Sequence, residues 1–150
     1  GMTTASVPTL AHAQMASGSV LQVVGFNSTT SFNTTSSTYQ VTHLTQSITP
    51  IYANSKIIIQ IFAGIHVNGV ADHGRGQIRK DGATITGYTE EDLLGYLATT
   101  ISRGGWVGSF AFTTAGSTNA ATYAYYAKSG ANADLLLYRN SGILITEIKQ

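Results

Sequence analysis

Two histidines and an aspartate lie close enough in the sequence to suggest a metal site. His66 falls near the end of an alternating apolar stretch, and Asp72 and His73 follow within the glycine-punctuated segment Gly69–Gly76. Two imidazoles and a carboxylate would suit zinc or iron. Their spacing matches no recognised ligand pattern, however, and polar residues are ordinary at the end of a strand. We therefore predict neither a metal nor a cofactor.

Three consecutive acids are the second candidate for chemistry. Glu90, Glu91 and Asp92 could supply the pair of carboxylates that glycoside hydrolysis uses. Consecutive residues on one short element point in different directions, whereas a helix starting at Thr89 explains acids in its first turn. We expect a short helix or an ordered loop here. No GxSxG motif occurs, and Gly74-Arg75-Gly76 lacks the lysine and serine of a phosphate-binding loop, so we predict no enzymatic activity.

Aromatic residues near the C-terminus are candidates for ligand contact. Tyrosine rings stack on sugars, but they equally fill the edge of a core or a subunit interface. Strand periodicity places Tyr123 and Tyr125 on one face and Tyr126 on the other. At most two of the three can therefore belong to the core. We interpret them, with Trp106, mainly as packing or interface residues, with ligand contact as the alternative.

The element that must position these residues is the stretch Ser55–Asn68. Its odd positions from Ile57 to Val67 are all apolar, and this period of two predicts a central β-strand. Its even positions are mixed: Ile58 and Phe62 stand among polar residues. That face is too apolar for water and too polar for a core, so we expect a partner subunit to cover it.

The remaining chain predicts one β domain, residues 18–150, preceded by an arm, residues 1–17, in which Leu10–Met15 could form a helical turn. The Asp81-Gly82 dipeptide favours a two-residue hairpin that places Ile78 opposite Ile85. A second hairpin is expected across Ser129–Asn132. About eight strands with turns every 8–12 residues are typical of an all-β antiparallel sandwich or jelly roll.

The composition excludes several classes of protein. The chain has 150 residues, of which 43% are hydrophobic and only 10% charged, against roughly 25% charged in typical globular proteins. Such a surface suits an extracellular or virion protein, or a subunit covered by partners. A net charge of +1 without a Lys/Arg stripe argues against nucleic-acid binding. No apolar run approaches the ~18 residues of a membrane span, and the absence of cysteine excludes disulfides and thiolate metal sites.

Several short motifs, taken in order, carry a family resemblance. They are Gly18–Val24 (GSVLQVV), Ser47–Lys56 (SITPIYANSK), Arg79–Gly82 (RKDG), Tyr123–Lys128, Leu137–Asn140 (LYRN) and Leu144–Lys149 (LITEIK). Their order resembles the small C-terminal β domains of phage tail-fibre-like proteins. The resemblance implies a jelly-roll-like sandwich, usually a homotrimer, at the host-facing tip of a virion appendage. It brings no shared catalytic residues.

We therefore expect a non-enzymatic virion domain that contacts other virion proteins and binds a glycan or protein receptor on the host surface. One alternative is a purely structural head- or tail-decoration protein without a receptor. The other is a tailspike-type glycan hydrolase.

Counting strands predicts where a ligand would bind. If the chain enters Ser19–Phe26 from the end that holds the arm, the opposite, distal end carries the connections 27–37, 68–76, 87–104 and 129–132. The connections 45–54, 81–82, 114–118 and 141–142 would then lie at the proximal end. Because binding residues usually lie on loops, we expect the ligand to contact residues of the distal connections. They are Phe32, Asn68, Asp72, His73, Arg75, Tyr88 and Glu91.

Overall fold

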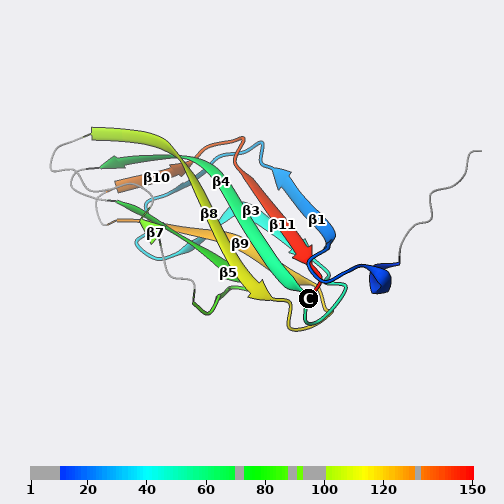
Figure 1. Cartoon of the computed structure of the whole chain (residues 1–150). Coiled ribbons are helices and arrows are strands. Elements are labelled where there is room, and N and C mark those ends of the chain that lie inside the picture. Colours follow the sequence, from blue (N-terminus) through cyan, green and yellow to red (C-terminus); the bar gives the residue numbers. More distant parts are fainter. Residues whose placement is uncertain (1–10, 70–72, 88–90, 93–100, 131–132) are drawn as a thin grey trace, which may run out of the picture.

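The computed structural model describes residues 11–69, 73–87, 91–92, 101–130 and 133–150. These residues form two antiparallel β-sheets packed face to face, so the prediction of an all-β sandwich is confirmed (Figure 1). A short 3-10 helix, η1 (His12–Gln14), precedes the sheets, within the stretch where a helical turn was expected. Nowhere in the described part of the chain is there a helix of the length and apolarity that a membrane crossing requires.

The first sheet, sheet A, is built around β4 (Lys56–Gly69), whose 14 residues pair along their whole length with β8 (Ile101–Thr114). The other edge of β4 pairs with two strands in series. β10 (Ala133–Leu137) takes the distal part and β11 (Gly142–Ile148) the proximal part. β1 (Val20–Asn27) then pairs with β11, and β2 (Phe32–Thr34) pairs with β10.

The second sheet, sheet B, has the order β3 (Gln40–Ile48), β9 (Ala121–Ser129), β5 (Gly74–Lys80) and β6 (Ala83–Thr84). The short strand β7 (Glu91–Asp92) pairs with the distal part of β5. The chain passes from one sheet to the other at most of its connections, as in a jelly roll.

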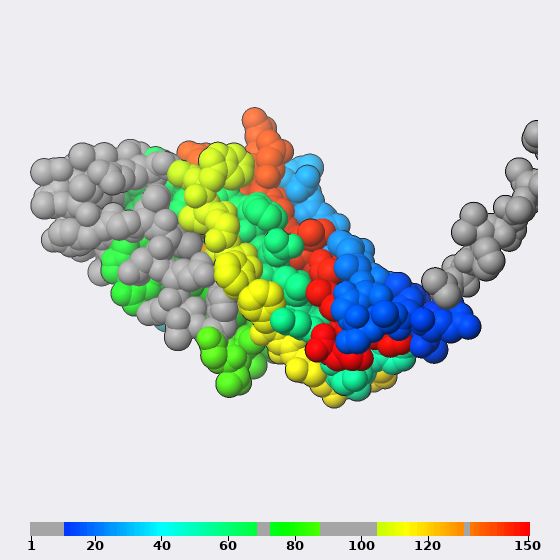
Figure 2. Space-filling model, viewed as in Figure 1, coloured from blue at the N-terminus to red at the C-terminus, as the bar shows by residue number. Residues whose placement is uncertain are grey.

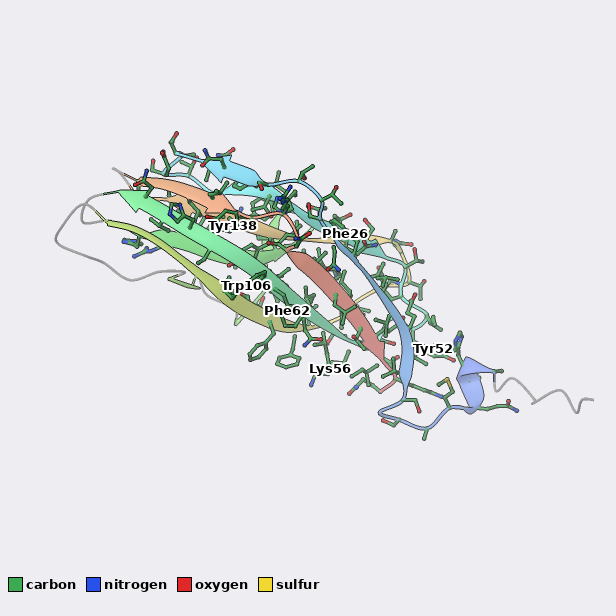
Figure 3. The ribbon with its side chains drawn as sticks, turned by 90° about the horizontal axis from the view of Figure 1, so that it is seen from above. Phe26, Tyr52, Lys56, Phe62, Trp106 and Tyr138 are labelled. Carbon is green, nitrogen blue, oxygen red and sulfur yellow. The ribbon has the colours of Figure 1, made fainter. Side chains whose placement is uncertain are left out.

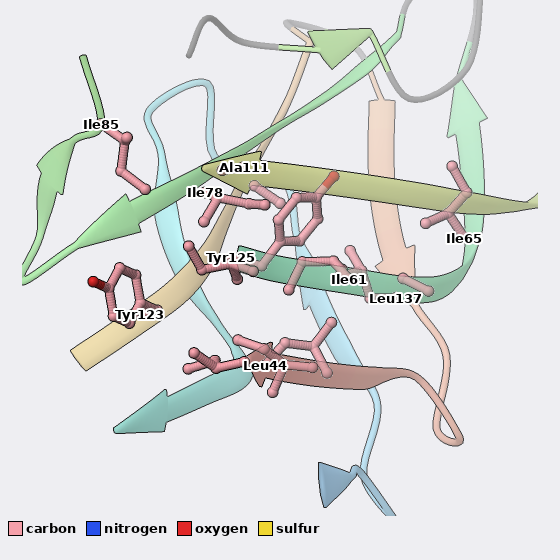
Figure 4. Packing of buried hydrophobic residues seen from close by; sticks show 14 of the residues in the cluster. Leu44, Ile61, Ile65, Ile78, Ile85, Ala111, Tyr123, Tyr125 and Leu137 are labelled. Atoms are coloured by element: carbon pink, nitrogen blue, oxygen red, sulfur yellow. The ribbon is translucent and has the colours of Figure 1, made fainter. Parts of the chain in front are cut away.

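The core lies between the two sheets and is supplied by alternate residues of their strands. All six odd positions of β4 from Ile57 to Val67 are buried, as the alternating pattern predicted. Tyr123 and Tyr125 on β9 are fully buried in this core (Figure 4). Tyr126 is partly exposed on the other face of the strand. The strand parity of the three tyrosines was therefore predicted correctly.

The expected hairpin at Asp81-Gly82 is confirmed. Lys80 pairs with Ala83, and both turn residues have positive φ, 50° for Asp81 and 80° for Gly82, as a type I′ turn requires. Ile78 and Ile85 are both buried, as the predicted register demands.

Several sequence-based expectations were wrong. No hairpin joins β9 to β10 across Ser129–Asn132, because the two strands belong to different sheets. The connection at 141–142 is not proximal, because Gly142 pairs with Phe62 in the middle of β4. Glu91–Asp92 form a short strand rather than the expected helix or ordered loop, because the edge of β5 offers hydrogen-bond partners to their backbone, and this pairing outweighs local helix propensity.

Candidate functional site

Three predicted distal connections meet at one end of the sandwich. Gly69, the last residue of β4, pairs with Ile101 on one side and with Ala133 on the other. Gly74 of β5 pairs with Ser129. The ends of the connections 68–76, 87–104 and 129–132 therefore lie side by side, as the strand count predicted.

The structure brings four of the seven predicted ligand-contact residues to this end. Asn68 is exposed on β4, and Glu91 pairs with Gly76. Arg75 lies between Lys128 on β9 and Asp92 on β7. His73 is half-buried, and its carbonyl oxygen accepts a hydrogen bond from the N–H of Gly130 at 2.8 Å.

Of the other three predicted residues, the structure describes only Phe32. Phe32 pairs with Leu137, next to Ile65 in the middle of β4, and packs half-buried against the core. Its expected place on an exposed loop was wrong, because the 27–37 connection contains β2, which joins sheet A. Asp72 and Tyr88 lie outside the described residues.

Metal binding would need several ligating side chains close together in the described residues. No group of three His, Asp or Glu side chains among them is placed to hold a metal ion. His43 is half-buried, and this burial lowers its pKa. In the described structure, neither of its ring nitrogens has a hydrogen-bond partner, so His43 activates no hydroxyl group there.

A cluster of tyrosines and cations, which sequence reasoning missed, lies on the outer face of sheet B. The Tyr39 ring centre is 4.9 Å from the guanidinium carbon of Arg79 and 4.6 Å from Lys128 Nζ. Arg79 also lies 4.6 Å from the ring centre of Tyr126, and its Nε donates to Gln77 Oε1 at 2.9 Å. We call Tyr39, Arg79, Tyr126 and Lys128 the cation–tyrosine cluster. All four side chains are partly exposed.

The outer face of sheet A is different, because it exposes large aromatic side chains. The exposed fractions are 73% for Trp106, 57% for Phe110, 52% for Phe62 and 50% for Phe112. We call these four residues the aromatic face. In Figure 3, Phe62 and Trp106 lie on the neighbouring strands β4 and β8. Phe110 and Phe112 form an edge-to-face pair with ring centres 5.4 Å apart.

The aromatic face continues across the sheet into a shallow groove. Figure 2 shows β8, β4, β11 and β1 side by side on this side of the molecule. The groove, of about 360 Å³, is lined by Phe26, Phe62 and Leu144, among others. Val23 and Leu144, also on this side of β1 and β11, are 51% and 36% exposed. The apolar surface is therefore continuous over several strands.

The proximal end is held by the fully buried carboxylate of Glu147. Its Oε1 accepts the backbone N–H groups of Ile51 at 2.8 Å and Tyr52 at 3.2 Å, and its Oε2 accepts Gln22 Nε2 at 2.6 Å. Burial opposes ionisation, but the Ser55 hydroxyl and these hydrogen bonds outweigh it and lower the pKa of Glu147. Three of the motifs that carry the family resemblance, GSVLQVV, SITPIYANSK and LITEIK, meet at this carboxylate.

The arm is attached to the same end by Lys149. Its Nζ donates to the carbonyl oxygens of His12 at 3.2 Å, Ala13 at 2.9 Å and Met15 at 2.6 Å. A cation at the C-terminal end of a helical turn also complements the partial negative charge of the carbonyls. The η1 turn is thereby held close to the C-terminus of the chain (Figure 1).

No protein-family model matches this sequence, and no curated protein matches it significantly. The function must therefore be inferred from the two exposed faces and the distal end.

Proposed function

We propose that this chain is a non-enzymatic virion-appendage domain of the tail-fibre type, which assembles as a homotrimer and binds a glycan or protein on the host surface. The observation that carries the proposal is the aromatic face on β4 and β8. The order of the short sequence motifs supports the tail-fibre assignment, and the convergence of loops at the distal end supports recognition there.

The area of the aromatic face is what a stable subunit contact needs. A large aromatic side chain presents about 150–250 Å², so exposed fractions of 50% to 73% leave roughly 350–600 Å² of apolar surface from four residues. A standard interface buries about 800 Å² on each partner, somewhat more than half of it apolar. A second copy of the chain can cover this surface, and a closed ring of three copies covers one such face on each.

The exposed aromatic residues also lie on the side of sheet A to which the even positions of β4 project, the side that the sequence predicts a partner subunit to cover. Phe62 projects from the even face of β4, between the buried positions Ile61 and Ala63. Its neighbours across the ladder are Gly108 on β8 and Gly142 on β11, so no large side chain shields it in the rungs beside it. A hydrophobic side chain in this setting is stabilised by association rather than by the fold of one copy.

Light scattering coupled to size-exclusion chromatography tests the assembly. At micromolar concentration we expect a mass near three times the 15.8 kDa of one chain. Trp106→Ser combined with Phe110→Ser should yield a folded monomer. Val41→Ser is the matched control, because Val41 is 51% exposed on sheet B and should leave the mass unchanged. A monomeric wild-type protein would refute the homotrimer.

Binding to host cells tests the recognition. Replacing His73, Arg75 and Tyr88 together by Ala should reduce binding of labelled protein to host cells without changing the oligomer mass. Unchanged cell binding would exclude these residues as the contact. Release of reducing ends from bacterial polysaccharide, abolished by Glu91→Gln, would instead favour the tailspike-type hydrolase.

The aromatic face also favours a second candidate, a purely structural head- or tail-decoration protein. Such a protein needs the subunit contact but no receptor. The two candidates predict the same oligomer mass and differ in the cell-binding assay. A trimer that binds no cells of any permissive host would favour the decoration protein.

A further inference from the structure

We propose that the cation–tyrosine cluster on sheet B binds the carboxylate-bearing sugars of an acidic polysaccharide. This inference rests on the proposed function, since it names the chemical class of the surface glycan. It places the contact on the outer face of β3, β9 and β5, beside the distal end rather than only on the loops at its tip.

The first observation is the concentration of positive charge on neighbouring strands. Of the eight Lys and Arg residues in the chain, Arg75 and Arg79 on β5 and Lys128 on β9 project from one face. Arg75 lies directly opposite Lys128 in the ladder. Like charges in directly opposed positions destabilise a sheet. Arg79 and Lys128, which both lie close to the ring of Tyr39, are the two cations that carry the site.

The second observation is that tyrosine rings hold the two cations in place. Both Arg79 and Lys128 lie within 5 Å of the ring centre of Tyr39, and Arg79 also lies over Tyr126. Gln77 accepts from Nε of Arg79, so this hydrogen bond does not occupy the two terminal guanidinium nitrogens. The cations are therefore oriented before a ligand arrives, which reduces the entropy lost on binding.

The chemistry of these side chains fits an acidic sugar. A guanidinium group offers a planar pair of donors that matches a carboxylate, and a lysine nearby adds a second positive charge. A tyrosine offers a ring face for the apolar side of a pyranose and a hydroxyl for its polar rim. Neutral sugars would use the rings but offer no negative charge to the two cations.

A nucleic acid fits this surface less well than a polysaccharide. Nucleic-acid sites have a strong excess of positive charge along a groove or stripe, whereas this chain has a net charge of +1 and a compact group of cations. An acidic polysaccharide carries about one charge per sugar or per repeat and needs only a few cations. The cluster also adjoins Arg75 and His73 at the distal end, where the proposed recognition takes place.

Binding to defined polymers at 150 mM salt tests the inference. Labelled polygalacturonate, hyaluronan and polysialic acid are the acidic probes, dextran is the neutral probe, and single-stranded DNA is the competing polyanion. We expect at least one acidic polysaccharide to bind more than tenfold more tightly than dextran or DNA. Arg79→Gln should weaken that binding tenfold or more, and Arg79→Lys should weaken it less, because it retains charge without the planar pair of donors.

The matched control is Arg139→Gln, which removes the same charge from an exposed arginine between β10 and β11. It should leave binding within twofold, and thermal unfolding should show that each variant is folded. A loss with Arg139→Gln equal to that with Arg79→Gln would overturn the inference. So would failure of all three acidic polymers to bind, or equal binding of dextran or DNA. Host-cell binding that persists in Arg79→Gln would overturn the inference while leaving the proposed function standing.

Discussion

Replacement of Glu147 by glutamine should destabilise the protein strongly, although the two side chains differ only in one terminal group. Glutamine has nearly the same shape, but it turns one of the two accepting oxygens into a donor. Gln22 Nε2, 2.6 Å from Oε2, would then face another donor, and the N–H groups of Ile51 and Tyr52 would meet a neutral acceptor. The variant therefore removes charge and hydrogen bonds without opening a cavity.

The magnitude follows from these three donors. Hydrogen bonds to charged groups contribute about 1.5–3 kcal/mol each, and neutral ones about 0.5–1.5 kcal/mol. One bond is lost and two are weakened, while the variant no longer has to bury a charge. We therefore expect Glu147→Gln to lower the free energy of unfolding at pH 7 by about 2–4 kcal/mol, measured by urea denaturation. Asp134→Asn is the control, because Asp134 is exposed on β10, and it should change stability by less than about 0.5 kcal/mol.

The pH dependence separates this cause from a packing defect. The pKa of Glu147 is lowered in the folded protein from its ordinary value of 4.5. The stability that its charge contributes is therefore fully present above pH 4.5 and is lost as the pH falls through the folded pKa. The difference between wild type and Glu147→Gln should shrink in acid. An equal difference at pH 7 and pH 3, or an effect no larger than that of Asp134→Asn, would refute the reasoning.

Three further predictions concern other parts of the fold. Tyr123→Phe should raise the free energy of unfolding by up to about 1 kcal/mol, because the buried Tyr123 hydroxyl has no hydrogen-bond partner in the described structure. Burial, with the charge of Asp81, raises the pKa of this hydroxyl to about 12. A clear loss of stability would contradict this prediction. Gly82→Ala should lower that free energy by about 1 kcal/mol, because Gly82 has a φ of 80°, and an unchanged urea midpoint would count against it. Lys149→Met should release η1, because Lys149 Nζ donates to three carbonyl oxygens of the arm. Hydrogen exchange at the amides of Gln14 and Met15 should then accelerate about tenfold, while the strands keep their protection. Equal exchange in both proteins would show that Lys149 does not hold the arm.

The alternation of apolar residues and the turn dipeptide were enough to predict those features that depend on neighbouring residues in the sequence. Side chains alternate across a pleat, so the buried row from Ile57 to Val67 and the parity of Tyr123, Tyr125 and Tyr126 could be derived by counting. The turn at Asp81-Gly82 followed equally from the need for two positive φ angles. These features depend on neighbours within a few residues.

Pairing between distant strands could not be derived in the same way. The residues around Glu91 do not indicate that it pairs with the edge of β5. The residues around Gly142 do not indicate that it pairs with the middle of β4. Phe32 seemed to lie on a loop because only its contact with Leu137 makes β2 a strand.

The candidate sites, too, were only partly predictable from local sequence. The period of two places Trp106, Phe110 and Phe112 on one face of a strand, but their exposure depends on what lies over β8. The cation–tyrosine cluster was missed because it exists only where β5 pairs with β9 and Tyr39 lies beside them. The available signal in the sequence was that Arg75 and Arg79, four residues apart, fall on the same face of a strand.

The division of one edge of β4 between β10 and β11 has a consequence for how such a protein can evolve. β10 and β2 belong to the distal half of the sandwich, β11 and β1 to the proximal half, and β4 with β8 spans both. The hydrogen bonds of the buried Glu147 lie within the proximal half. Substitutions, insertions or recombination in the distal half therefore leave the proximal half with its own complete set of strand partners. Sequence changes can therefore accumulate in one half of the domain while the other half keeps its structure.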